Sequence, residues 1–94
     1  MLNSICIENF NRYLTEVKKA SQNTLSSYLR DIRQLADDLD THTGDSLDHA
    51  TDDDLSTYIS WLRGNGKSVA TVSRAIASLK CFYGWLLSEG SIKE

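Results

Sequence analysis

The chain contains no proline, and its hydrophobic residues recur at steps of three and four along most of its length. Proline is the residue that most strongly interrupts a helix, and this step matches the 3.6 residues of a helical turn. The pattern therefore predicts an all-α fold, a bundle of four helices at about residues 4–19, 21–39, 52–63 and 69–89. A length of 94 residues fits one domain, and we expect residues 1–94 to form it.

Capping residues and glycines predict where the helices begin and end. Thr51 and Ser68 are suitable N-caps, while Gly64 and Gly90 are expected to end the third and fourth helices. Residues 40–50 are polar and predict a loop in which only Leu47 is buried. The apolar face predicted for the first helix consists of Ile7, Phe10, Tyr13, Leu14 and Val17. Trp85 lies off the apolar stripe of the fourth helix, and we expect burial within the domain rather than at an interface.

Acidic residues are concentrated in one stretch of the chain. The net charge is −3, but eight of the thirteen acids fall between positions 37 and 54, where there is no Lys or Arg. The remaining residues carry ten basic and five acidic side chains. Because a phosphate responds to local charge, the net value does not exclude a nucleic-acid partner. The eight acids are Asp37, Asp38, Asp40, Asp45, Asp48, Asp52, Asp53 and Asp54.

No residue pattern in this chain predicts catalysis, a cofactor or a metal. The acidic stretch fails the calcium-loop pattern, because His49 stands where the final Glu should be and Thr43 where glycine is required. The two histidines, His42 and His49, are expected on the surface. Cys6 and Cys81 are far apart in sequence and predict two buried thiols of a cytosolic protein. We expect no membrane span, because no apolar run approaches the roughly 20 residues required, and no secretory signal.

Two predicted helices carry a polar face with small and basic side chains. Such faces suit the major groove, because Ser, Thr and Asn can donate to phosphates or base edges and Arg can bind phosphate or guanine. Capping sequences on ordinary solvated faces explain the same residues, and composition by itself favours that explanation. The second helix contributes Asn23, Ser26, Ser27, Arg30 and Gln34, with Arg33 at the flank, and the fourth contributes Lys67, Ala70, Thr71, Arg74 and Ser78.

Four sequence runs, in this order, give the chain a family resemblance. They are FNRYL at 10–14, SQNTLSSYLRDI at 21–32, SVATVSRAIASLKCFYGWL at 68–86 and GSI at 90–92. Together they resemble the amino-terminal SAM-like, or core-binding, domain of tyrosine recombinases, the phage integrases and Xer-type enzymes. The resemblance covers nearly the whole chain and implies a four-helix SAM-like bundle that forms half of a C-shaped clamp around DNA.

The resemblance also implies which residues bind and what they bind. The second and fourth helices would cross the major groove, and the catalytic residues would lie in a carboxy-terminal domain, so this chain is expected to be an excised piece with no enzymatic activity of its own. Expected partners are double-stranded DNA, that catalytic domain and other recombinase protomers, in the cytoplasm at the nucleoid. A protein-interaction module that uses the acidic 37–54 surface is the alternative. The expected DNA contacts are Asn23, Thr24, Ser26, Ser27, Arg30, Lys67, Thr71, Arg74 and Ser78.

Overall fold

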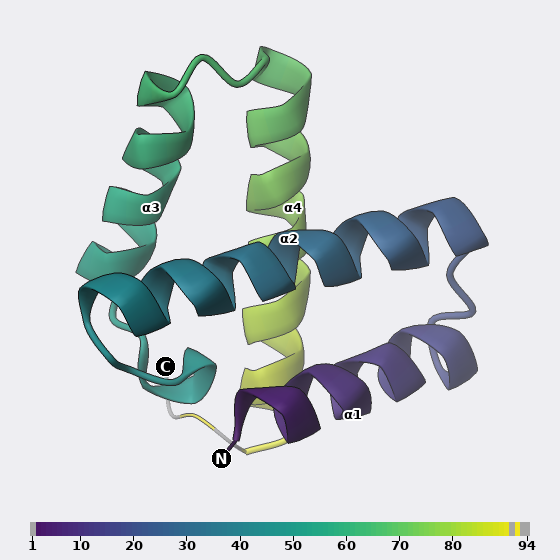
Figure 1. The fold of residues 1–94 in the computed structure, drawn as a ribbon. Helices are drawn as coiled ribbons and strands as arrows, with labels where there is room; N and C mark the ends of the chain where they lie inside the picture. The colour runs from purple at the N-terminus through teal and green to yellow at the C-terminus, as the bar shows by residue number, and fades with distance from the viewer. Residues whose placement is uncertain (1, 91, 93–94) are drawn as a thin grey trace.

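Four α-helices are arranged as two hairpins that cross each other. The computed structural model describes residues 2–90 and 92, and in this part of the chain there is no strand. α1 and α2 lie side by side, α3 and α4 do likewise, and α2 crosses α4 steeply (Figure 1). The all-α prediction is confirmed. The elements are α1 (Asn3–Glu16), α2 (Gln22–His42), a 3-10 turn η1 (Leu47–His49), α3 (Asp52–Gly64) and α4 (Val69–Ser88).

Side-chain caps fix the beginnings of three helices. Ser21, Thr51 and Ser68 each accept a hydrogen bond from the backbone N–H three residues later, which satisfies a donor that the helix itself leaves unpaired. At α3 the Asp54 carboxylate also accepts from the N–H of Thr51, which completes a capping box. The predicted N-caps Thr51 and Ser68 are confirmed.

The first two helices end at other positions than those predicted. α1 stops at Glu16 because Lys19 takes a left-handed backbone conformation, with φ of 52°, and Val17 is 68% exposed instead of buried. α2 continues to His42, three residues beyond its predicted end, so part of the predicted loop is helical. Leu47 is fully buried as predicted, in the 3-10 turn η1, where its N–H donates to Asn3 Oδ1 at 2.9 Å.

Glycines follow the last two helices, although not at both predicted positions. Gly64 is the last residue of α3 and does not form the turn; Gly66 does, with φ of 76°. Gly90 has φ of 74° directly after the cap of α4, so its predicted role is confirmed. Only a residue without a Cβ adopts this left-handed conformation at little cost.

An aromatic cluster fills the core where α1 meets the second half of α4. Phe10 lies edge-on to Phe82, with 5.0 Å between ring centroids, and 5.4 Å from Trp85. Trp85 also stacks on Tyr13 and is only 6% exposed, which confirms its predicted burial within the domain. Its indole N–H has no hydrogen-bond partner among the described residues. Within the same residues, no helix combines the length and hydrophobicity that a membrane crossing requires.

Candidate nucleic-acid interface

A bidentate ion pair joins α2 to α4 where the two helices cross. Arg74 donates from Nε to Oδ2 of Asp31 at 3.1 Å and from Nη2 to Oδ1 at 3.0 Å. The Asp31 side chain is 6% exposed and that of Arg74 is 36% exposed, so the carboxylate is buried while the guanidinium reaches the surface. Two parallel hydrogen bonds of this kind fix both the distance and the plane of the guanidinium.

A third donor completes the hydrogen bonding of the Asp31 carboxylate. The Ser78 hydroxyl lies 2.7 Å from Oδ2 of Asp31 and 3.0 Å from the carbonyl oxygen of Arg74. The hydrogen bonds to Asp31 and the negative charge of Asp31 both raise the pKa of Arg74 above its ordinary value, because they stabilise the charged guanidinium. Asp31, Arg74 and Ser78 therefore form one network, which we call the crossing network.

The crossing network shows that the two predicted polar faces meet. Asn23 and Ser27 precede Asp31 by two helical turns and one, so all three lie on one face of α2. On α4, Thr71 lies one turn before Arg74 on the same side. Since Asp31 contacts Arg74 directly, the face of α2 that carries Asn23 and Ser27 adjoins the face of α4 that carries Thr71.

The expected DNA contacts divide into three groups by exposure. Asn23, Thr24, Ser26, Arg30 and Lys67 are exposed, and Ser27, Thr71 and Arg74 are partly buried. Ser78 is the exception and corrects the sequence prediction: it is 0% exposed, and its hydroxyl is bonded to Asp31. Ser78 therefore cannot reach a phosphate or a base from this position.

Sequence reasoning also missed a residue, Asp31. Asp31 is not part of the polar face that the sequence predicts for the second helix, because it lies beside the apolar stripe of that helix. It is the only acid between positions 17 and 36. Its spacing of four and eight residues from Ser27 and Asn23 was the available signal. What the sequence could not supply was the basic partner, which lies 43 residues further along the chain.

The threonines at the beginnings of α2 and α4 belong to matching caps. Ser21 Oγ accepts from the N–H of Thr24 at 3.2 Å and donates to Thr24 Oγ1 at 3.0 Å. Ser68 and Thr71 repeat this arrangement with 3.1 and 3.0 Å. The capping explanation is therefore correct for both serines, while each threonine hydroxyl still has its own proton to donate.

The eight acidic residues between positions 37 and 54 lie outside the crossing network. They occupy the second half of α2, the segment around η1 and the first turn of α3. His42 and His49 lie in the same part of the chain, exposed as predicted.

In the part of the chain that the structure describes, no three His, Cys, Asp or Glu side chains converge as they would to hold a metal. Cys6 is a buried free thiol, as predicted, and Cys81 is a partly buried one.

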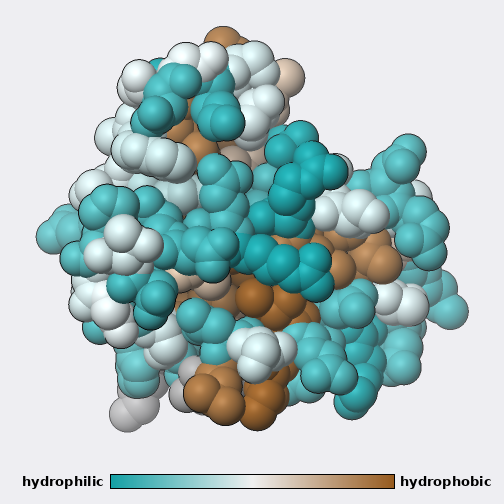
Figure 2. All heavy atoms as spheres, in the orientation of Figure 1, coloured by the Kyte–Doolittle hydropathy of each residue, from teal (hydrophilic) through white to brown (hydrophobic). Residues whose placement is uncertain are grey.

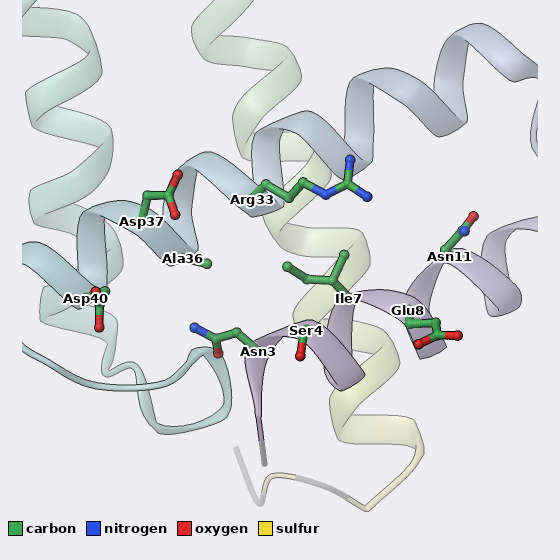
Figure 3. Close-up of a pocket in the computed structure, with 9 residues that line it drawn as sticks. All are labelled: Asn3, Ser4, Ile7, Glu8, Asn11, Arg33, Ala36, Asp37 and Asp40. Atoms are coloured by element: carbon green, nitrogen blue, oxygen red, sulfur yellow. The ribbon is translucent and has the colours of Figure 1, made fainter.

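A surface cavity of about 580 Å³ lies between α1 and α2. In Figure 3 Ile7 rises from α1 toward α2, whereas Glu8 points away from it. Three acidic residues, Glu8, Asp37 and Asp40, and one basic residue, Arg33, line this cavity. This excess of carboxylates repels phosphate.

Figure 2 shows a mostly hydrophilic face on which hydrophobic surface appears between α1 and α2.

Comparison with known proteins gives a family match over most of the chain. Residues 7–90 match the family described as phage integrase, N-terminal SAM-like domain. A protein of Caldanaerobacter subterraneus that carries a tyrosine recombinase name is 36% identical over 88 residues, 94% of this chain and 30% of that protein. Tyrosine recombinase XerD of Agrobacterium fabrum is 36% identical over 84 residues, 89% of this chain and 25% of that protein.

Other relatives show the same partial coverage. Tyrosine recombinase XerD of Oceanobacillus iheyensis is 36% identical over 87 residues, 88% of this chain and 28% of that protein. The chain thus spans between a quarter and a third of the length of these curated relatives. No solved structure matches it significantly.

Proposed function

This chain belongs to the family of phage integrase N-terminal SAM-like domains, and we propose that it binds duplex DNA across α2 and α4 on behalf of a tyrosine recombinase. The recombinase's cutting and rejoining of strands would be performed by a separate catalytic domain. Its partners would then be double-stranded DNA, that catalytic domain and further protomers on the same DNA, in the cytoplasm at the nucleoid.

The observation that carries the proposal is the contact between the two polar faces through Asp31 and Arg74. A duplex can lie against two helices at once only if their polar faces form one continuous surface, and the crossing network joins them. The same two elements carry exposed donors, with Asn23 and Arg30 on α2 and Lys67 just before α4. These residue types supply most hydrogen bonds to phosphates and bases in protein–DNA complexes.

The beginnings of α2 and α4 add a second source of attraction. Each helix N-terminus carries partial positive charge and unpaired backbone N–H groups, and neither first turn contains an acid. α3 differs, because Asp52, Asp53 and Asp54 occupy its first turn and repel phosphate. Of the three side-chain-capped helices, the two at the proposed interface are therefore the two that can receive a phosphate.

Titration of the 94-residue chain with duplex DNA tests the proposal. We expect amide chemical shifts to change for residues 22–30 of α2 and for residues 67–74, while residues 37–54 stay unchanged. Lys67→Ala should weaken binding. It should also reduce the slope of the logarithm of the association constant against the logarithm of salt concentration by about 0.9, the value for one lost phosphate contact.

Arg63→Ala is the matched control for Lys67→Ala. Arg63 is also an exposed basic residue, but it lies near the end of α3 and lines a groove with Ile76 and Lys80 of α4 that includes no residue of the crossing network. Both variants remove one positive charge, so a general charge effect would lower affinity equally. Equal losses, or shifts confined to residues 37–54, would overturn the proposal, and the second result would indicate a protein-interaction surface instead.

A further inference from the structure

The Arg74 side chain is held on one edge and open on the other. A guanidinium carries five N–H donors in a planar fork. Asp31 takes the Nε–H and one N–H of Nη2, the side edge of the group. The other three donors, on Nη1 and Nη2, have no acceptor among the described residues. Two of these three, one on Nη1 and one on Nη2, are parallel and form the end edge, which has the geometry for two parallel bonds to O6 and N7 of guanine.

The charge of this arginine is offset by Asp31 at 3.0 Å. An arginine that served only to attract phosphate would be weakened by a carboxylate so close, since counterion release depends on net positive charge. What the carboxylate adds is orientation, because it locks a long side chain that would otherwise sample many rotamers. The arrangement therefore favours directional hydrogen bonding over general attraction.

The residues around Arg74 leave room for a base edge. Ser27 on α2 and Thr71 on α4 are short side chains on the two adjoining faces, and both are partly exposed. Ser78 stays below the surface, where its bond to Asp31 at 2.7 Å keeps the carboxylate in place. Ser27 and Thr71, one turn before Asp31 and Arg74, are therefore too short to block the approach of a duplex to the end edge of Arg74.

We propose that Asp31 is a positioning residue that aims the end edge of Arg74 at a guanine in the major groove. Arg74 then supplies base preference, and exposed cations such as Lys67 supply salt-dependent affinity. The inference rests on the proposed function and adds to it a residue, Asp31, that does not itself contact DNA. Ser78 is a second positioning residue, because its hydrogen bond to Asp31 helps to hold the carboxylate that orients Arg74.

Selection from a pool of random-sequence duplexes, with the 94-residue chain at low salt, gives the base preference of each variant. We expect the wild-type chain to prefer guanine at one position by about fivefold or more. Arg74→Lys keeps the charge but loses the fork and should abolish this preference. Asp31→Asn, which loses one of the two acceptors for Arg74, should reduce it while overall affinity stays equal or rises, since a negative charge is removed.

Lys67→Ala is the control, because it should change affinity and leave base preference unchanged. It should weaken binding to all duplexes alike and leave the guanine preference intact. If Asp31→Asn or Arg74→Lys keeps the wild-type preference, the positioning role is wrong, although DNA binding itself stands. If the wild-type chain binds no duplex from the pool, the proposed function fails, and this inference fails with it.

A measurement without DNA tests the same geometry independently. The Nε–H proton of Arg74 is bonded to Asp31 and should exchange with water more slowly than that of Arg30, which is exposed. Asp31→Asn should speed its exchange, and Ser78→Ala, which leaves the charge unchanged, should do so to a smaller extent. Equal exchange rates for Arg74 and Arg30 in the wild-type chain would contradict the proposal even if Asp31→Asn failed to fold.

Discussion

Tyr83 on α4 donates a hydrogen bond from its hydroxyl to the backbone carbonyl of Leu47, with 2.8 Å between the two oxygens. The bond ties α4 to η1, the turn that carries part of the acidic stretch. Burial raises the pKa of Tyr83 well above its ordinary value, so the hydroxyl stays a donor throughout the physiological range. One side chain thereby holds the long connection between α2 and α3 against the core.

Removal of this hydroxyl should destabilise the domain. Tyr83→Phe leaves the Leu47 carbonyl without its partner, which should lower the free energy of unfolding by about 1–2 kcal/mol. Urea denaturation followed by circular dichroism measures the change. Tyr28→Phe is the control, since Tyr28 is also partly buried and its hydroxyl has no partner among the described residues. An equal loss in both variants would show that the bond to Leu47 is not the cause.

Stability should fall in alkaline solution because of Tyr58. Burial, followed by the charges of Asp31 and Asp38, raises the pKa of Tyr58 from 10.0 to about 12. The folded state therefore retains a proton that the unfolded chain releases, so the free energy of unfolding should fall as pH rises above 10. Urea titrations between pH 8 and 11.5 measure this slope. Tyr58→Phe should make it shallower, and an unchanged slope would remove Tyr58 as a contributor.

The two matching serine caps should contribute equally to stability. Ser21→Ala and Ser68→Ala each remove the oxygen that accepts the N–H of the threonine three residues later. Each should lower the free energy of unfolding by about 1 kcal/mol, measured by thermal or urea denaturation. Ser73→Ala is the control, because Ser73 is exposed within α4 and caps no helix. A cost at Ser73 as large as at Ser68 would argue against capping.

The two thiols should differ in reactivity toward a disulfide reagent. Cys6 is 1% exposed, and burial raises its pKa from 9.0 to about 11, so at pH 8 only about 0.1% would be thiolate. Cys81 is partly buried and should react first, with Cys6 modified only as denaturant is added. Cys81→Ser should then leave a chain that is almost inert when folded. Fast labelling of that variant would contradict the burial of Cys6.

Sequence reasoning succeeded where structure is set by neighbouring residues. The hydrophobic period gave four helices, and Thr51 and Ser68 cap two of them as predicted. It failed at Val17, which continues the hydrophobic period but lies just beyond the end of α1, two residues before the backbone turns left-handed at Lys19. A helical wheel describes the faces of a single helix. It does not show at which residue the backbone leaves the helical conformation.

The proposed interface was predictable as two faces but not as one surface. Wheels drawn for α2 and α4 placed Ser78 on an outer face, and α2 in fact covers it. They also separated Asp31 from the face that holds Asn23 and Ser27. Both differences arise from a contact between residues 43 and 47 positions apart, which depends on how the two hairpins cross.

The crossing network has a thermodynamic consequence. Its partners are distant in sequence, so the surface around Arg74 exists only while α2 and α4 are docked. A duplex that engages this surface selects the docked molecules, and its binding must raise the melting temperature of the chain in proportion to the logarithm of DNA concentration. Conversely, a core substitution that loosens the two hairpins would lower the proposed DNA affinity although it changes no residue at the surface.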